Sequence, residues 1–264
     1  MRSTPTDERL RLARRRGLWA LASREMRRVM TLWSQTILPP VLTGAIFLAV
    51  FGGALGSELG SVAGTDYLTF ILPGLLVMTV AGQAFANNST SVFQAKNEGY
   101  IDDVLTSPLL AWQLAAGYMS GGLLRGWLSA ALVWLVASPF GDAVERPAVV
   151  IAALLLTGVI FGALGVITGV WADSFDQQAF IASVVIAPLA LVGGVFYAVS
   201  RLDEPWRSLT RLDPIYYLVD ATRFGYVGVH ESSVGAALAI ATVAAAALCA
   251  LLVWLLARGW RLKE

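Results

Sequence analysis

The stretch PAVVIAALLLTGVIFGALGVITGVWA, residues Pro147–Ala172, has no charged side chain and decides the fold class of the chain. About 20 consecutive apolar residues in an α-helix cross the hydrocarbon core of a membrane. Within lipid, a helix satisfies its backbone hydrogen bonds inside its own segment, whereas an open sheet leaves its edge groups unpaired. The stretch therefore predicts a membrane-spanning helix.

The same pattern recurs on both sides of this stretch. Five further charge-free runs are each long enough to cross a membrane: Val29–Ser57, Tyr67–Ala95, Val104–Leu124, Gln177–Ser200 and Ser232–Ala257. Charged residues make up only 14% of the 264 residues, against about 25% in an ordinary soluble domain. We therefore expect an all-α integral membrane protein, with six spans in one transmembrane domain over residues 31–264.

Positive charges are distributed unevenly along the chain. Nine of the 19 Lys and Arg residues lie within the first 28 residues. With a cytoplasmic N-terminus, six spans place thirteen of these cations in the cytoplasm and five, between Arg146 and Arg223, outside it. Cytoplasmic loops of membrane proteins are enriched in Lys and Arg. We therefore expect a multi-pass protein of the inner (plasma) membrane with both termini in the cytoplasm.

The basic segment over residues 1–30 predicts a cytoplasmic tail followed by an interfacial helix. Apolar residues are interleaved with Arg from Leu10 to Val29, which is typical of an amphipathic helix on an anionic membrane surface. We expect this helix over Gly17–Met30 and no ordered structure in residues 1–9. The alternative is a disordered positive tail that only sets the topology.

The long outer segment Ser200–Glu231 has apolar residues at helical spacing between its charges. Pro205, Pro214 and Gly225 are expected to break it into short helices, because proline lacks an N–H donor and glycine disfavours helix interiors. We expect re-entrant-like helices in the outer half of the membrane before the last span. The alternative is an aromatic-rich loop that only packs.

The chain lacks the residue patterns of a catalytic or metal site. Cys249 and His230 are its only cysteine and histidine, and Lys96 and Lys263 are its only lysines. The G-x-x-x-x-G-K-[ST] phosphate loop is missing, so the chain cannot bind ATP in that way. We expect no catalytic, cofactor-binding or metal site in this chain, and no nucleic-acid partner.

Three segments resemble one known family. They are AKNEGYIDDVLTSPL (Ala95–Leu109), GGVFY (Gly193–Tyr197) and DPIYYLVDATRFGYVG (Asp213–Gly228). The first is similar to an acidic-x-Gly-x-x-acidic-x-Leu-x-Ser-Pro pattern after the second span. The third is similar to an Asn-Pro-x-x-Tyr…Arg-Tyr-Gly signature, with Asp213 where Asn is usual. The chain thus resembles the bacterial ABC-2 type permeases, in particular the YadH-like inner-membrane permeases.

The resemblance implies a type V (ABC-2) exporter fold and a coupling helix at about residues 94–108 that docks on a nucleotide-binding subunit. The residues implied in this coupling are Glu98, Gly99, Ile101, Asp102, Asp103, Leu105, Ser107 and Pro108. Helical spacing independently places Ile101, Val104 and Leu105 on one face, with the acids toward water. Without the resemblance, a solvated turn is the alternative. Asp173 and Asp176 in the next inner loop are a possible second contact.

Arg125 interrupts the third span, because Gly126–Phe140 is too short to cross the membrane unaided. A charge at mid-depth costs about 3 kcal/mol or more and is usually paired or directed into a cavity. Gly121, Gly122 and Gly126 beside it allow neighbouring helices to approach closely. Arg125 therefore lines a pathway or an inter-subunit contact, or it pairs with helix-end carbonyl groups.

The function implied by the resemblance is that of the transmembrane subunit of an ATP-driven exporter of drugs, lipid-linked molecules or glycans. Two nucleotide-binding ATPase subunits would bind ATP and Mg²⁺, and a second copy of the chain or a paralogue would complete the pathway within the lipid. The alternatives are an ion-coupled secondary transporter and a non-transporting assembly factor. The near absence of acids in the spans argues against ion coupling.

The topology can be tested with Arg14→Cys, Asn97→Cys, Asp142→Cys and Lys263→Cys, each in a Cys249→Ser background. We expect an impermeant thiol reagent added to spheroplasts to label only the cysteine at position 142, because the charge asymmetry places the other three inside. Labelling after permeabilisation shows that each cysteine can react. Labelling of positions 14 and 263 from opposite sides would contradict an even number of spans.

Overall fold

The computed structural model describes residues 5–54, 61–62, 64–139 and 143–261. In chain order the helices are α1 (Pro5–Thr31), α2 (Trp33–Thr36), α3 (Leu38–Phe47), η1 (Leu48–Ala54), α5 (Tyr67–Asn97), α6 (Ile101–Leu105), α7 (Ala111–Ala137), α8 (Pro147–Trp171), α9 (Phe175–Ile181), η2 (Ala182–Ile186), α10 (Ala187–Val192), η3 (Val199–Arg201), α11 (Trp206–Leu212), α12 (Pro214–Val227) and α13 (Val234–Arg258). Strands β1 (Ser61–Val62) and β2 (Thr65–Asp66) form an antiparallel pair, with Ser61 opposite Asp66.

Among the described residues, six helical segments are long and apolar enough to cross a membrane. They are Trp33–Phe51, Tyr67–Asn97, Ala111–Ala137, Pro147–Trp171, Phe175–Val192 and Val234–Arg258. Each overlaps one of the six charge-free runs. The expected all-α, six-span, multi-pass membrane fold is therefore confirmed.

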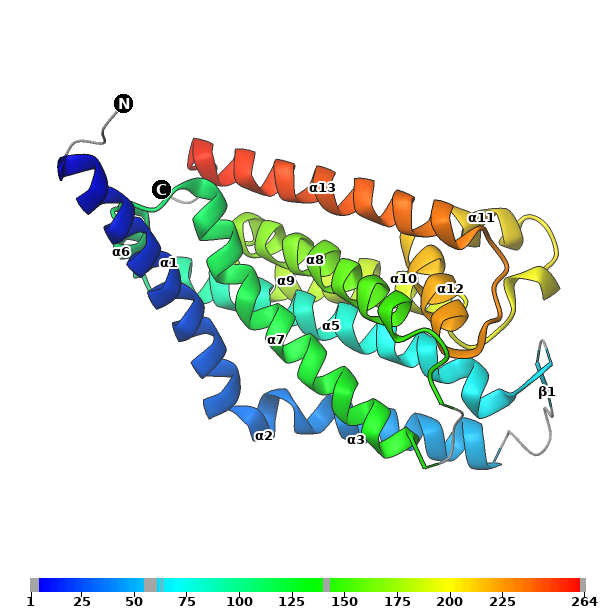
Figure 1. Cartoon of the computed structure of the whole chain (residues 1–264). Coiled ribbons are helices and arrows are strands. Elements are labelled where there is room, and N and C mark those ends of the chain that lie inside the picture. The colour runs from blue at the N-terminus through cyan, green and yellow to red at the C-terminus, as the bar shows by residue number, and fades with distance from the viewer. Residues whose placement is uncertain (1–4, 55–60, 63, 140–142, 262–264) are drawn as a thin grey trace.

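Both ends of the described chain lie at the same end of the helix bundle. Figure 1 shows the start of α1, helix α6 and the end of α13 together, and we call this the α6 end. Strand β1, α11 and α12 lie at the opposite end, the α11 end. This arrangement requires an even number of crossings.

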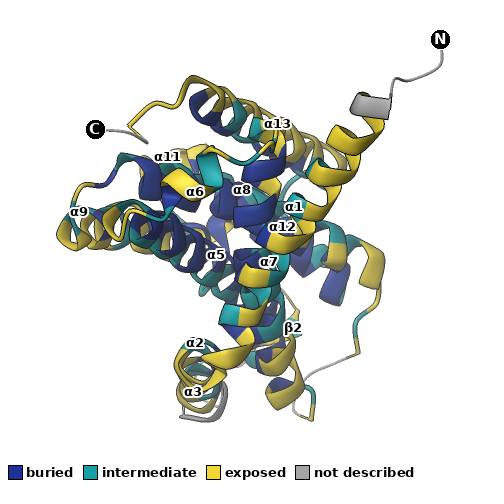
Figure 2. Cartoon of the chain, turned by 90° about the vertical axis from the view of Figure 1, so that its left-hand side faces the viewer, coloured by how far each residue is buried: buried dark blue, intermediate teal, exposed yellow. Residues whose placement is uncertain are grey.

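Helix α5 is the centre of the bundle and contacts α7, α8 and α12. In the most apolar continuous stretch of 18 residues of each span, 72% of the residues are buried in α5 but only 17% in the first and in the fifth span. Figure 2 shows the same contrast, with buried residues concentrated in α5 and α8 and exposed residues along α3. The first and fifth spans therefore present most of their apolar surface to whatever surrounds the chain.

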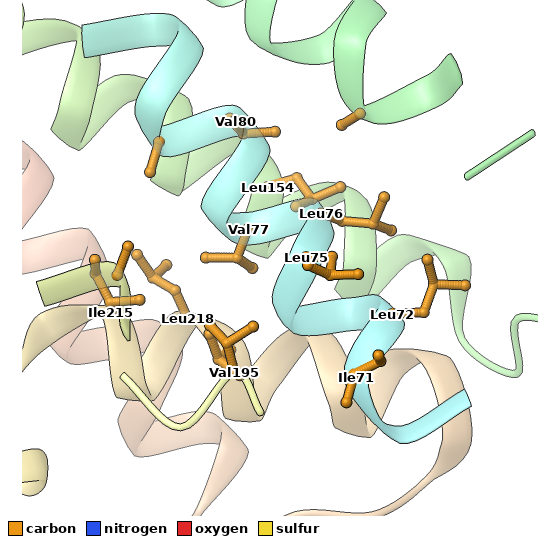
Figure 3. Close-up of a cluster of buried hydrophobic side chains, with 14 of the residues drawn as sticks. Ile71, Leu72, Leu75, Leu76, Val77, Val80, Leu154, Val195, Ile215 and Leu218 are labelled. Carbon is orange, nitrogen blue, oxygen red and sulfur yellow. The ribbon is translucent and has the colours of Figure 1, made fainter. Parts of the chain in front are cut away.

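The half of α5 nearest the α11 end packs in an apolar cluster. Figure 3 shows Ile71, Leu72, Leu75 and Leu76 of α5 near Leu154 of α8. Residues of the long outer segment and of the preceding turn, Val195, Ile215 and Leu218, are fully or almost fully buried in the same cluster. The outer segment therefore contributes to the core of the membrane domain.

Three boundaries differ from the sequence-based expectations. Helix α1 already includes Pro5–Arg9, where we expected no ordered structure; Asp7 and Glu8 in its first turn favour a helix N-terminus. The fifth span ends at Val192, because the chain turns at Gly193 and Gly194. Gly225 does not break α12: the helix continues to Val227 and ends at Gly228, whose φ is +72°.

The close contact between α5 and α8 depends on glycine. A Cβ atom at Gly165 would lie 2.6 Å from the Phe85 carbonyl oxygen, which is closer than real Cβ atoms approach. A Cβ atom at Gly82 would meet nothing within 4 Å. These two glycines form a matched pair, one at a tight helix contact and one facing open space.

We expect Gly165→Ala to destabilise the protein by about 1–3 kcal/mol, because the added methyl group forces α5 and α8 apart. Gly82→Ala should be neutral or slightly stabilising, since Ala is the better helix former by about 1 kcal/mol. Thermal unfolding of the purified proteins, followed by size-exclusion chromatography, measures the difference. Equal melting temperatures for the two variants would show that the α5–α8 contact can accept a methyl group at position 165.

Candidate functional site

The coupling segment contains a shorter helix than expected. Helix α5 extends to Asn97, so residues 94–97 belong to the second span and not to a separate helix. The chain then turns at Gly99, with a φ of +78° that glycine tolerates readily, and α6 covers only Ile101–Leu105. The expected coupling helix over residues 94–108 is therefore wrong in extent, because residues 94–97 still belong to the second span and the turn at Gly99 separates them from α6.

The faces of α6 are arranged as helical spacing predicts. Ile101 is buried, and Val104 and Leu105 pack with it against α7, α8 and α13. Glu98, Asp102 and Asp103 are exposed. A short helix held by its apolar face therefore presents acidic side chains at the α6 end. Their contact with a partner subunit remains a prediction.

Helix α1 holds both ends of this segment. The Arg14 Nε atom donates a hydrogen bond of 3.0 Å to the carbonyl oxygen of Pro108. At the other end, the Arg24 guanidinium carbon lies 5.2 Å from the centre of the Tyr100 ring, and burial raises the pKa of the Tyr100 hydroxyl. Ser107 donates its hydroxyl to the carbonyl of Val104 and so closes α6. Displacing α6 would therefore disturb α1 as well.

A hollow of about 760 Å³ lies beside α6, between the two connections at this end. The Lys96 ammonium donates to the carbonyl oxygen of Val170 at 2.7 Å and lies 3.7 Å from the Asp173 carboxylate. Arg261 donates to Asp173 at 3.2 Å. Asp173, predicted as a second contact, thus already has two basic partners within the chain, whereas Asp176 is exposed.

A buried polar network joins α1 to α5. Glu25 is 2% exposed, lies 3.2 Å from the Arg28 guanidinium and accepts a hydrogen bond of 2.6 Å from the Ser91 hydroxyl. Arg28 also donates to the Asn87 carbonyl oxygen at 3.2 Å, and Gln178 of α9 donates to Ser89 at 2.7 Å. A charged side chain in apolar surroundings requires such partners.

This polar network between α1 and α5 was not predicted from the sequence. Asn87-Asn88-Ser89-Thr90 contains glycosylation sequons, whereas in the structure Asn87, Asn88 and Ser89 are buried. The sequence nevertheless indicated such contacts, because consecutive polar residues inside a charge-free span usually form hydrogen bonds between helices.

The outer segment is fixed by a buried arginine. Arg223 of α12 is 2% exposed; its Nε donates to the Phe70 carbonyl oxygen at 3.3 Å and its Nη2 to that of Gly194 at 2.8 Å. Its guanidinium carbon lies 3.8 Å from the centre of the Phe70 ring. The DPIYYLVDATRFG and GGVFY motifs therefore meet at one site against α5.

Asp213 begins α12 as its N-cap. Its Oδ1 atom accepts a hydrogen bond of 2.8 Å from the Ile215 amide, while its Oδ2 atom is buried and has no hydrogen-bond partner in the described part of the chain. An Asn side chain keeps the same acceptor, which explains why either residue can begin this motif.

Arg125 lies near the middle of α7, where it both bonds to a helix-end carbonyl group and lines a cavity, while its expected role in a pathway or an inter-subunit contact stays a prediction. Its Nε atom donates to the Thr36 carbonyl oxygen, at the end of α2, at 3.1 Å. The side chain also lines a cavity of about 400 Å³ bounded by α3, α5, η2 and α10. Arg125 is thus half-buried at a cavity and bonded to a helix-end carbonyl group.

A family model described as ABC-2 type transporter matches residues 16–227, from within α1 to the end of α12. The chain therefore belongs to the ABC-2 type transporter family, as the three motifs predicted. It is 36% identical over 217 residues to the inner membrane transport permease YadH of Escherichia coli K12, covering 82% of this chain and 84% of that protein.

Two more distant relatives have other names. Nodulation protein J of Neorhizobium galegae is 22% identical over 185 residues, covering 69% of this chain and 71% of that protein. The probable multidrug ABC transporter permease YbhR of Escherichia coli K12 is 29% identical over 171 residues, covering 61% of this chain and 45% of that protein.

We expect Asp213→Asn to be at least as stable as the wild-type protein, because it keeps the cap and removes a buried carboxylate with one unpaired oxygen. Asp213→Ala should lose about 1 kcal/mol, the usual contribution of an N-cap side chain. Thermal unfolding of the purified variants in neutral detergent measures both changes. Equal melting temperatures for the two variants, both below that of the wild-type protein, would show that the charge, and not the cap, stabilises α12.

Proposed function

We propose that this chain is the transmembrane permease subunit of an ATP-binding cassette exporter, and that a separate subunit binds ATP and Mg²⁺ and hydrolyses the ATP. Family membership supports the class of protein, and α6 is the observation that carries the mechanism. A docking element must be rigid to transmit force. Helix α6 is held by buried Ile101, by the turn at Gly99 and by α1, while Asp102 and Asp103 are exposed.

We assign the α6 end to the cytoplasm, where the ATPase subunit would reside. The basic helix α1 and the end of α13, which includes Arg258, lie at this end, whereas α11, which contains Arg207 and Arg211, lies at the other. This distribution is the one expected for a protein of the inner membrane with both termini inside. The hollow beside α6 then faces the ATPase.

We also assign two copies of the chain, or this chain and a paralogue, to each complex. The first and fifth spans are the least buried, and both line the cavity that contains Arg125. A charged cavity is unfavourable against lipid, so a second subunit across this opening would shield it. Two permease subunits would present two α6 helices to two ATPase subunits.

The names of two relatives bear on the cargo class. The name of one relative refers to multidrug transport and that of another to nodulation. An exporter of drugs, lipid-linked molecules or glycans is consistent with both names and with a pathway bounded by apolar spans.

The test is the double charge reversal Asp102→Lys/Asp103→Lys in a tagged full-length chain. We expect normal membrane insertion but at least about a tenfold loss of a co-purifying P-loop ATPase, because like charges at an interface cost several kcal/mol. ATPase activity of the purified complex and its mass, with two copies of each subunit expected, complete the measurement.

The matched control is Asp203→Lys/Glu204→Lys, which reverses two exposed acids at the α11 end and should leave the complex intact. Full ATPase association by the Asp102→Lys/Asp103→Lys variant would remove the coupling role of α6. Transport by a chain that co-purifies with no ATPase at all would contradict the exporter function itself.

A further inference from the structure

We propose that the cavity between the first, second, third and fifth spans binds an anionic amphiphile, with its acidic group at Arg125 and its apolar chain along α3. This inference rests on the proposed function and narrows it by naming the chemistry of the bound molecule. It is carried by the charge balance at Arg125, by an unpaired amide oxygen of Gln83 in the wall of the same cavity and by the shape of the apolar wall.

The charge of Arg125 is not balanced within the described chain. A guanidinium group has five N–H donors. The described residues accept only the Nε donor, through the Thr36 carbonyl oxygen, and none of their acids forms an ion pair with Arg125. Arg28 of α1 is itself paired with Glu25, so this acid does not balance Arg125. The Arg125 guanidinium therefore has no counter-ion among the described residues, and a phosphate or carboxylate group can accept from its remaining donors.

Gln83 supplies a second polar group to the same cavity. Its side chain lines the cavity wall, and its Oε1 atom is buried without a hydrogen-bond partner among the described residues. Buried polar atoms in native structures nearly always have a partner, so an unpaired one requires an explanation. Rotation of the Gln83 amide would turn this shielded acceptor into the cavity, where a hydroxyl or amide next to the acidic group of a ligand would donate to it.

The rest of the cavity fits an apolar chain. Phe47, Leu75, Met78 and Ile186 are among its lining residues, and its volume of about 400 Å³ lies within the usual range of ligand sites. A second hollow of about 170 Å³ continues along α3 toward η1 and shares Thr43 and Phe47 with the first. Together they form a track that begins at Arg125 and follows α3 toward the α11 end.

The binding test uses the purified full-length chain in a neutral sugar detergent and three probes. Oleoyl lysophosphatidic acid has both the acidic group and the chain, monoolein has the chain alone, and inorganic phosphate has the charge alone. Binding of the two lipids is measured by native mass spectrometry, and phosphate is added as a competitor. We expect lysophosphatidic acid to bind at least about tenfold more tightly than monoolein, as one charge-assisted contact predicts.

Two variants test separately the part of the site that would hold the acidic group and the part that would hold the apolar chain. Arg125→Met should abolish the preference for lysophosphatidic acid, and Gly82→Leu should weaken binding of both lipids, because its side chain would enter open space at the cavity wall. The controls are Arg27→Met, which removes an exposed cation of α1, and Gly235→Leu, which adds the same side chain where a Cβ atom meets nothing within 4 Å. Neither control should change binding.

Equal affinity of the wild-type chain for the two lipids would overturn the proposal without any variant, so the test survives if Arg125→Met does not fold. If Arg27→Met and Arg125→Met lost the preference for lysophosphatidic acid equally, general surface charge would explain that preference. This result would also overturn the proposal. If inorganic phosphate displaced bound lysophosphatidic acid as effectively as free lysophosphatidic acid does, the apolar chain would contribute nothing to binding. That result would exclude the track along α3. Because binding is measured without an ATPase, a failure here leaves the exporter function standing, and a failure of ATPase co-purification leaves the binding result standing.

Discussion

The arrangement of the whole domain depends on one side chain, the amide of Asn88. Its Nδ2 atom donates to the Gly162 carbonyl oxygen of α8 at 3.1 Å, and its Oδ1 atom accepts from the Gly122 amide of α7 at 2.9 Å. Lipid is as apolar as leucine, so helices in a membrane associate through close packing and hydrogen bonds rather than through hydrophobic burial. Separating α5 from either neighbour would expose an unpaired amide to hydrocarbon, which costs several kcal/mol.

With α5 fixed in this way, each end of it holds a different helix that is not one of the six spans. At the α6 end, Ser91 and Asn87 bond to Glu25 and Arg28 of α1. At the α11 end, the Phe70 carbonyl group and ring hold Arg223 of α12. The 31-residue helix α5 thus connects the element next to α6 with the outer segment. In the proposed exporter, a force applied to α6 would reach both α1 and α12 through one continuous helix.

Much of this architecture could be predicted from the sequence, and what could not has a physical reason. The spans were predictable because lipid imposes a local rule on every residue between Pro147 and Ala172, and the faces of α6 followed from its own i, i+3 and i+4 spacing. The burial of Glu25 was not predictable, because its partner Ser91 lies 66 residues away on another helix. Gly225 looked like a helix breaker, but it permits contact with Val150, where a Cβ atom would lie 2.8 Å away. Long-range packing decided both cases.

The two arginines buried among the helices show how a structural charge differs from one available to a ligand. Arg223 is almost completely buried; two carbonyl oxygens accept from its Nε and Nη2 atoms and the Phe70 ring lies against it, so a ligand could reach its guanidinium group only by displacing the outer segment. Arg125 is only half-buried, makes one hydrogen bond to the described chain and lines a cavity. Both residues incur a cost of desolvation, but only in Arg223 does the fold itself offset that cost. A cation that the fold leaves uncompensated at a cavity is stabilised by whatever anion enters, and this asymmetry is the physical reason for assigning the binding role to Arg125 rather than to Arg223.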